Sequence, residues 1–452
     1  MVRRGTLRCA NPCHARHNRL SRRPALRYHH VHKNEQSKKR VDMMSRSAIL
    51  AGVFVMLIPA CGGAAGLIDT SPRPQERGST SVTETRAFQA WVNDFRPRAM
   101  REGISGDTFD RAFRNVRFNT GVIERDRNQG EFTRAIWDYL DSAVSDRRVE
   151  NGRAALADHR DVLAAIEARY GVAPEVVVAV WGVESSYGDY RGDTAIIEAL
   201  ATLAHEGRRG AFFEEQLIGA LRIIQDGDVA PEDMTGSWAG AMGHTQFIPT
   251  SYLSYAVDFR GTGERDIWSD DPTDALASTA SYLAEHGWTR DQPWGVEIDL
   301  PSGLEGRQGR RPVADWRADG VTLADGSTLP DHGTAKLFQP AGVAGPAFLT
   351  FANFDVIKRY NPADAYAMAI GHLADRIGGA GDFNGAWPRD HRPLTGDERR
   401  ELQERLTARG FDTQGIDGRV GPNTVAAVRA FQTAEGMAPD GYVSHDLLER
   451  LR

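Results

Sequence analysis

The chain has 452 residues, of which 41% are hydrophobic and 26% are charged. This composition is ordinary for globular proteins, so it excludes a chain that is disordered throughout, and the length predicts about three domains at roughly 150 residues each. The formal net charge of −6 hides a split, because residues 1–46 carry +11 and residues 47–60 carry no charge. The remaining residues therefore carry −17, and an acidic body of this kind has no general attraction for nucleic acid.

The N-terminal part of the chain has the pattern of an export signal. Ser47–Ala60 is a stretch of 14 almost wholly apolar residues that follows a basic segment. It is shorter than the roughly 20 residues that span a membrane comfortably, and a basic start before a short apolar core is typical of a signal peptide. Met43 and Met44 stand where such a signal would begin, so we interpret the preceding stretch as a mis-assigned start. We predict that residues 1–60 are a basic presequence and a signal peptide.

Cys61 follows this signal directly. Ile58–Cys61 resembles the lipobox of bacterial lipoproteins, in which the cysteine becomes the lipidated first residue, although Pro59 departs from the pattern. The alternative is cleavage by ordinary signal peptidase within Cys61–Gly66. Either route leaves at most one cysteine, so we expect no internal disulfide even in an oxidising compartment. We predict a periplasmic protein whose membrane attachment is a lipid on Cys61, at the outer membrane.

Helical periodicity dominates the chain after residue 83. Phe88, Val92 and Phe95 recur at helical spacing, and Ala363–Ile377 shows a similar pattern. Between these stretches glycine and proline become frequent, and segments such as Trp294–Leu300 and Lys336–Gln339 have strand character. We predict a mainly α protein with these parts: a linker at 61–83, a main domain at 84–379 with a small β-rich insertion at 291–350, a linker at 380–394 and a helical tail at 395–452.

A single carboxylate stands at the end of an apolar helix in the main domain. Pro174 suits the first turn of a helix, and Gly188 is expected to end it. Val180 and Trp181 lie four and three residues before Glu184, on the same helical face. Burial of this kind raises the pKa of a carboxyl group, and a Glu that stays protonated near neutral pH can donate a proton to a leaving oxygen. The alternative is a Glu that points into water near the helix end.

Two further segments combine small, aromatic and polar residues. Gly236–Tyr252 contains glycines, among them Gly243, that let another backbone or a sugar approach closely. The same segment contains Ser237 and Gln246, which can hydrogen-bond a polar ligand. Phe351–Asn361 is the third segment, and a helical stretch follows it.

These segments carry the sequences WGVESSYG, GSWAGAMGHTQFIPTSY and NFDVIKRYN with AYAMAI. Together they resemble the membrane-bound lytic transglycosylase B family of bacterial cell-wall enzymes, and the resemblance covers roughly Glu84 to Gly378. It implies a lysozyme-like α+β catalytic domain. It also implies cleavage of the β-1,4 bond between N-acetylmuramic acid and N-acetylglucosamine in peptidoglycan, with 1,6-anhydromuramic ends formed without water.

The resemblance also assigns roles to individual residues. It implies that Glu184 is the catalytic acid and base, and that Ser237 and Gln246 bind sugar and support Glu184. The residues that it places in the substrate cleft are Tyr139, Tyr360, Asn361 and Tyr366. His244 and Thr245 replace an aromatic-glycine pair of the family. Either this change alters ligand preference or pH response, or it is a neutral variation on the groove wall.

One carboxylate is sufficient for this reaction. A hydrolytic glycosidase usually needs two, whereas a lytic transglycosylase uses the muramic C6 hydroxyl as an intramolecular nucleophile with a large effective-molarity advantage over water. The candidate second carboxylates are Asp189, which we expect to be solvated, and Asp193, which we interpret as the N-cap of the next helix. The alternatives are a hydrolytic muramidase on the same fold and a non-catalytic scaffold that binds the cell wall.

Asp258–Trp268 resembles an EF-hand-like calcium loop that part of the family carries. Asp258 and a glycine fit positions 1 and 6 of such a loop, but position 3 is Arg260 and position 12 is Ser269, where calcium requires oxygen donors and an acid. We therefore predict that the loop from Asp258 to Ser269 binds no calcium tightly. Glu264 and Asp266 are instead expected to pair with neighbouring arginines. No other metal or cofactor is predicted.

Residues 395–452 alternate helical segments with Asp-Gly turns. Apolar residues at helical spacing are predicted to form the core of this tail: Leu402, Leu406, Val425, Val428, Phe431 and Leu447. The tail resembles the three-helix peptidoglycan-binding domain of many wall hydrolases, which implies that it retains the protein on its polymer. We expect peptidoglycan glycan strands as the partner, no nucleic-acid partner, and a monomer.

Overall fold

The computed structural model describes residues 82–127 and 134–452. The predicted presequence and signal peptide, Cys61 and all but the end of the 61–83 linker lie outside the described residues. Among the described helices, none is long and apolar enough to cross a membrane.

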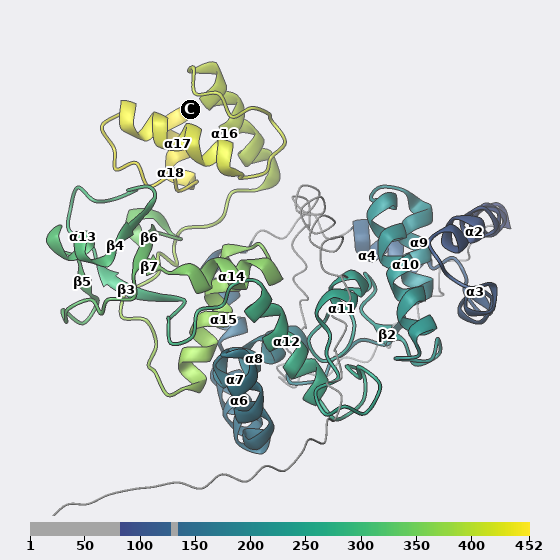
Figure 1. The fold of residues 1–452 in the computed structure, drawn as a ribbon. Coiled ribbons are helices and arrows are strands. Elements are labelled where there is room, and N and C mark those ends of the chain that lie inside the picture. Colours follow the sequence, from purple (N-terminus) through teal and green to yellow (C-terminus); the bar gives the residue numbers. More distant parts are fainter. Residues whose placement is uncertain (1–81, 128–133) are drawn as a thin grey trace, which may run out of the picture. The chain divides into compact units, whose positions relative to one another are not determined.

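The first helices of the main domain pack onto a helical pair. The helices of this part are α2 (Val82–Arg101), α3 (Gly106–Phe113), α4 (Thr120–Arg127), α9 (Ile196–Glu206) and α10 (Gly210–Asp226). α9 and α10 lie side by side (Figure 1), α2 and α4 contact α9, and α3 contacts α10. The predicted core residues Phe88, Val92 and Phe95 are buried, because helical spacing puts them on one face of α2.

A second group of helices surrounds the predicted acid. Its members are α5 (Ile136–Ala143), α6 (Asp146–Asp158), α7 (Arg160–Tyr170), α8 (Pro174–Ser185) and α15 (Asp364–Ile377). α8 starts at Pro174 as predicted and packs along α15 and against α6 and α7. α8 and α15 are antiparallel. Tyr366 near the start of α15 contacts Glu184 near the end of α8, and a Cβ added at Gly378 would lie 3.6 Å from the Cγ of Glu175.

Short elements connect these two groups of helices. They are β1 (Thr194–Ala195), β2 (Thr235–Gly236), α11 (Pro249–Tyr255) and α12 (Thr273–Glu285). The prediction that Asp193 caps the next helix is wrong, because β1 pairs antiparallel with β2 and occupies the two residues that follow Asp193. α9 therefore starts at Ile196 with Ala195 as its N-cap, and Asp193 is exposed.

The predicted β-rich insertion is an antiparallel sheet with a core of its own. Its strands are β3 (Gly295–Asp299), β4 (Arg310–Pro312), β5 (Thr322–Leu323), β6 (Thr334–Phe338) and β7 (Ala347–Thr350), in the order β4-β6-β7-β3-β5. β3 and β6 lie within one or two residues of the predicted strands. The short helix α13 (Val313–Ala318) supplies Trp316 to the core beneath the sheet. α14 (Ala352–Tyr360) follows β7 and returns the chain towards α15.

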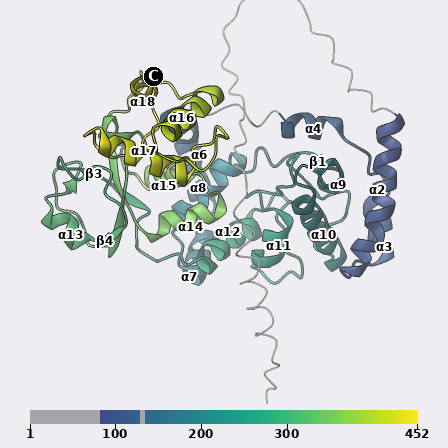
Figure 2. The same ribbon diagram turned by 90° about the horizontal axis from the view of Figure 1, so that it is seen from above.

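The tail is a three-helix unit, as predicted, and its helices lie close together (Figure 2). It consists of α16 (Gly396–Ala408), α17 (Pro422–Ala434) and α18 (His445–Leu451). All of the predicted core residues are buried except Val425, which is only partly buried. The prediction that Val425 is a core residue is wrong, because α17 turns it towards Gly441. A Cβ added to Gly441 would lie 2.8 Å from the Val425 Cγ1. Val425 therefore lies at the rim of the tail core.

Candidate active site around Glu184

Glu184 and Tyr366 form the centre of the site. Glu184 is the next-to-last residue of α8, and Tyr366 lies in the first turn of α15. The Tyr366 hydroxyl donates to the Glu184 Oε1 at 2.6 Å. Burial raises the pKa of Glu184 to about 7, and the hydrogen bond from Tyr366 opposes that rise. Glu184 thus holds a proton near neutral pH and is still partly exposed, as a general acid requires.

Three tyrosines surround this carboxyl group. Tyr139 comes from α5 and Tyr360 ends α14, while the Tyr360 and Tyr366 rings stack with centroids 6.5 Å apart. Burial, together with the negative charge of Glu184, raises the pKa of all three hydroxyls above the usual value for tyrosine. All three therefore stay protonated, and the Tyr360 and Tyr366 hydroxyls donate hydrogen bonds. The structure brings these three predicted residues together with Glu184.

The end of α8 is held in an unusual backbone conformation. The helix ends at Ser185 and not at Gly188 as predicted, because Ser186, Tyr187 and Gly188 have φ values of 51°, 62° and 91°. Left-handed conformations at residues other than glycine are costly and cluster at functional sites. The Ser185 Oγ stabilises this turn by accepting from the Gly188 N–H at 3.0 Å.

Tyr187 explains why α8 contains a glycine two residues before the acid. The Tyr187 ring folds back over Gly182, where an added Cβ would lie 2.5 Å from the ring. The Tyr187 hydroxyl reaches α6 and donates to the Arg148 carbonyl at 2.6 Å. This fold-back determines where the helix ends, and it packs the segment after Glu184 against the Trp181 ring.

Gln246 is fixed in orientation and keeps one uncommitted atom. Its φ is 54°, and its Nε2 donates to the carbonyls of Gly243 at 2.8 Å and Arg191 at 3.1 Å. Only the amide NH2 can donate to two carbonyls, so the opposite amide orientation is excluded. The Gln246 Oε1 is buried and has no hydrogen-bond partner among the described residues. This oxygen can therefore accept a hydrogen bond from a ligand N–H or O–H group.

Ser237 builds the turn that follows β2. Its Oγ accepts from the Ala241 N–H at 2.9 Å, and its own N–H donates to the Ala241 carbonyl at 2.7 Å. The turn presses against the loop after α8, since an added Cβ at Gly192 would lie 2.2 Å from the Gly236 oxygen. In residues 82–127 and 134–452, neither Ser237 nor Gln246 forms a direct hydrogen bond with Glu184. Their role in binding sugar stays a prediction.

Two asparagines shape the third motif. The buried Asn361 Oδ1 accepts from the Ala363 N–H at 3.1 Å, so it sets the turn between α14 and α15 that carries Tyr360 and Tyr366. Sequence reasoning assigned no role to Asn353, which is fully buried. Its Nδ2 donates to the Thr289 and Gln292 carbonyls at 2.9 and 2.6 Å. The side chain thus anchors the loop before β3, and an Asn on an otherwise apolar helix face is the signal that could have indicated it.

His244 and Thr245 are both buried, so their side chains do not form a groove wall. The Thr245 carbonyl accepts from the Tyr360 hydroxyl at 2.6 Å. The His244 ring lies behind α8 and hydrogen-bonds Trp181. Asp189 and Asp193, the candidate second carboxylates, are exposed, and the solvated position predicted for Asp189 is confirmed.

The loop from Asp258 to Ser269 is held by its own backbone. The Asp258 carboxylate accepts from the N–H groups of Gly261, Thr262 and Gly263 at 2.7, 2.9 and 2.7 Å. The prediction that Glu264 and Asp266 pair with arginines is wrong, because Arg260 pairs with Asp271 and Arg265 pairs with Asp228. Asp266 instead accepts from the N–H groups of Trp268 and Ser269. Over the described residues, no group of three or more His, Cys, Asp or Glu side chains could hold a metal ion.

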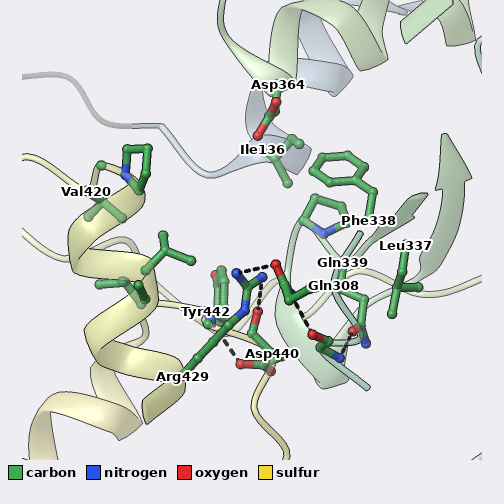
Figure 3. A pocket seen from close by; sticks show the side chains of 18 of the residues that line it. Ile136, Gln308, Leu337, Phe338, Gln339, Asp364, Val420, Arg429, Asp440 and Tyr442 are labelled. Carbon is green, nitrogen blue, oxygen red and sulfur yellow. Dashed lines mark hydrogen bonds between the residues drawn. The ribbon is translucent and has the colours of Figure 1, made fainter. Parts of the chain in front are cut away.

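A cavity of about 930 Å³ is lined by residues of the insertion and the tail, and by main-domain residues that include Ile136 and Asp364 (Figure 3). Arg429 of α17 donates to the Gln308 Oε1 and to the Asp440 carbonyl, both at 3.1 Å. Asp440 in turn accepts from the Val343 N–H at 2.9 Å. None of the predicted site residues lines this cavity.

Comparison with known families agrees with this geometry. Residues 87–375, more than half of the chain, match the family described as transglycosylase SLT domain. Residues 395–451 match the peptidoglycan binding domain family. This match and the helical fold around Glu184 define a transglycosylase domain, and the chain belongs to the transglycosylase SLT domain family.

The particular proteins that the chain is similar to are lytic transglycosylases. It is 34% identical to membrane-bound lytic murein transglycosylase B of Escherichia coli K12 over 246 residues, which are 53% of this chain and 66% of that relative. The chain thus spans just under two thirds of this curated relative.

Two crystal structures show the likeness in fold. SltB3 from Pseudomonas aeruginosa in complex with NAG-NAM-pentapeptide is 49% identical with a TM-score of 0.78, covering 81% of this chain and 99% of that chain. Slt35 of Escherichia coli in complex with calcium is 29% identical with a TM-score of 0.56, covering 68% and 98%. The predicted fold class, a mainly α lysozyme-like domain with a small β-rich insertion and a helical tail, is confirmed.

Proposed function

We propose that this protein is a lytic transglycosylase. It cleaves the β-1,4 bond between N-acetylmuramic acid and N-acetylglucosamine in peptidoglycan and leaves 1,6-anhydromuramic ends. The observation that carries the proposal is one carboxyl group, Glu184, whose pKa is raised to about 7 and which receives a hydrogen bond from the protonated Tyr366. A group that titrates near the working pH can both give and take a proton.

Glu184 serves both halves of the reaction. It first donates its proton to the bridging oxygen as the bond from that oxygen to the muramic C1 breaks. The muramic C6 oxygen then forms a bond to C1, and its proton returns to Glu184. Atoms and charge balance without water or a second carboxylate. The hydrogen bond from Tyr366 stabilises the carboxylate that exists between these steps.

The surrounding polar groups bind the substrate. We assign substrate binding to Ser237, Gln246, Tyr139, Tyr360, Asn361 and Tyr366. The uncommitted Gln246 Oε1 suits the N–H of an acetamido group. SltB3, at 49% identity, has been crystallised in complex with NAG-anhNAM-pentapeptide, which supports an anhydro product for the present chain.

Product analysis tests this proposal. Purified sacculi digested by the wild-type protein are expected to release muropeptides with anhydro ends, which mass spectrometry finds lighter than reducing ends by one water. Glu184→Gln should release none, while Asp189→Asn, which changes an exposed carboxylate after the same helix, should behave as wild type. Reducing ends from the wild type would indicate a hydrolytic muramidase instead. Binding to sacculi without any product would indicate a non-catalytic scaffold.

We propose that this enzyme works without calcium or any other cofactor. Arg260 stands where the loop needs an oxygen donor and is paired with Asp271, and Ser269 stands where it needs an acid. Slt35, a structural relative, has been crystallised with calcium. Thermal unfolding with 1 mM calcium or with a chelator should give the same midpoint to within about a degree, since a ligand that does not bind cannot stabilise. A rise in the midpoint with calcium would contradict this.

We propose a periplasmic, monomeric protein tethered by a lipid on Cys61 and retained on glycan strands by the tail. The curated relative is described as membrane-bound, and the tail belongs to a peptidoglycan-binding family. Fractionation of cells that express Cys61→Ala should move the protein from the outer membrane to the soluble periplasm. An unchanged distribution would favour ordinary signal-peptide cleavage. Sedimentation with sacculi tests retention, and light scattering tests the monomer.

A further inference from the structure

The His244 ring has three polar contacts, and the Trp181 and Ser269 contacts determine its protonation state. The Trp181 Nε1 lies 3.1 Å from the His244 Nδ1, and the Ser269 carbonyl oxygen lies 2.7 Å from the His244 Nε2. An indole N–H can only donate and a carbonyl can only accept. The Nδ1 of His244 must therefore be unprotonated, and its Nε2 must carry the hydrogen. The partners select one neutral tautomer.

These contacts support the end of α8 from two sides. Trp181 lies one helical turn before Glu184, and its indole is held by the His244 ring. The Ser185 hydroxyl, next to Glu184, donates to the His244 carbonyl at 2.5 Å. Because left-handed residues follow the helix at once, the last turn has no helical continuation to stabilise it. His244 supplies that stabilisation from outside the helix.

Charged groups face the other side of the ring. The Arg191 NH1 lies 3.2 Å from the His244 Nε2 and also donates to the Ser269 carbonyl at 2.7 Å. Arg191 is paired with Asp270 at 2.8 Å, and the charge of Asp266 also acts on the ring. On the α8 side, His159 stacks edge-on against Trp181 at 5.4 Å. A second positive charge on His244 would therefore lie beside a guanidinium group and would remove the acceptor for Trp181.

We propose that His244 is a positioning residue: its unprotonated Nδ1 holds Trp181, and through Trp181 it holds the last turn of α8, so that Glu184 keeps its contact with Tyr366. Protonation of Nδ1 at acid pH breaks this link and lowers kcat. The inference rests on the proposed function, because it concerns the acid that performs the reaction.

Glu184 and His244 together predict a bell-shaped dependence of kcat on pH. Burial lowers the pKa of His244, and Arg191 adds to this, while the bond to Ser269 and the charges of Asp266 and Asp270 oppose it. His244 is thus neutral in the range where Glu184, with a pKa of about 7, still holds its proton. kcat should fall above about pH 7 as Glu184 ionises. It should fall again on the acid side, below the usual histidine range, as His244 takes up a proton.

Two substitutions at position 244 separate the hydrogen bond to Trp181 from the hydrogen bond to Ser269. In His244→Asn the amide oxygen stands near the former Nδ1, so it can accept from Trp181 and does not titrate. In His244→Gln the amide nitrogen reaches the Ser269 carbonyl, but Trp181 loses its acceptor. On soluble uncrosslinked peptidoglycan strands we expect His244→Asn to keep kcat within about threefold and to lose the acid limb. We expect His244→Gln to lower kcat about tenfold with little change in KM. The reason is that the buried Trp181 N–H is left without an acceptor, and the free-energy cost of such an unpaired donor corresponds to about a tenfold change in rate.

Further variants make the outcome decisive. In a Trp181→Phe background, His244→Gln should have no additional effect, because the link is already absent. His205→Asn, which changes another histidine with a lowered pKa in α9, should leave the acid limb in place. Equal losses in His244→Asn and His244→Gln, or an acid limb that persists in His244→Asn, would overturn the inference. Reducing ends from the wild type would overturn the proposed reaction instead, so the two failures are distinguishable.

Discussion

The two ends of the α8–α15 pair carry the same kind of acid in different surroundings. At one end the Tyr366 hydroxyl donates to Glu184 at 2.6 Å, and at the other the Trp294 Nε1 donates to the Asp375 Oδ2 at 2.7 Å. Desolvation of the carboxyl group raises the pKa of Glu184 to about 7 and that of Asp375 to about 6, although Asp375 as a whole residue is exposed. Each end also has an aromatic ring lying on a helix glycine, Gly182 or Gly371.

What differs is the set of groups around each acid. Glu184 lies among three protonated tyrosines and next to a strained helix end. Asp375 accepts from an indole that can only donate, and the neighbouring Arg376 is paired with Asp146 and Asp382. A raised carboxyl pKa is therefore not enough to identify a catalytic acid. In the proposed function, the hydroxyl and amide groups assigned to substrate binding distinguish the Glu184 end.

The largest expected effect separates the two acids directly. Glu184→Gln should lower the rate of anhydro-product formation by at least about 10³-fold, because it removes the proton that the leaving oxygen requires. Asp375→Asn should change the rate less than about twofold. Rates of product release from sacculi measure both. Comparable losses of rate in the two variants would contradict the functional difference between Glu184 and Asp375.

Removal of the Tyr366 hydroxyl should have the next largest effect. Tyr366→Phe loses the hydrogen bond that opposes the rise in the pKa of Glu184, so the alkaline limb of the rate profile should move above pH 7. The rate should fall by about 10- to 100-fold, since a charge-assisted hydrogen bond contributes about 1.5–3 kcal/mol. A limb that moves to lower pH would contradict the role of Tyr366.

The pH dependence of stability should differ between the same two acids. A carboxyl with a raised pKa costs stability as pH rises from its unfolded value to its folded value. Glu184→Gln should therefore unfold with the same free energy as wild type at pH 4, and should be more stable by up to about 3 kcal/mol at pH 8. Asp375→Asn should show the same sign with a smaller gain, because Asp375 has the smaller rise in pKa and is more exposed. Urea denaturation at pH 4, 6 and 8 measures this, and a Glu184→Gln variant less stable at pH 8 would contradict it.

The two helix glycines give the smallest and sharpest contrast. An added Cβ would lie 2.5 Å from the Tyr187 ring at Gly182 and 2.4 Å from the Trp294 ring at Gly371. Gly182→Ala and Gly371→Ala should each destabilise the protein by about 1–3 kcal/mol through overpacking. Only Gly182→Ala should also lower kcat of the folded enzyme, because the Tyr187 ring that packs on Gly182 positions the segment after Glu184. Equal kcat values for the two variants would show that the Tyr187 packing is merely structural.

Local patterns predicted the elements well and the long-range contacts poorly. Apolar spacing located α2 and α15, strand character located β3 and β6, and the three motifs indicated Glu184 and Tyr366. The end of α8 was misplaced, because it depends on Tyr187 packing over Gly182 and bonding α6. The ring of His244 meets an indole 63 residues away. Such contacts depend on how helices cross, and no periodicity in one segment encodes that.

The antiparallel packing of α8 and α15 has a consequence for the newly made chain. Glu184 and the hydroxyl that serves it are 182 residues apart in sequence, with the whole sheet insertion between them. A nascent polypeptide that has emerged only as far as the insertion carries the acid without its donor. Completion of the centre is thereby delayed until synthesis has passed α15, close to the end of the main domain.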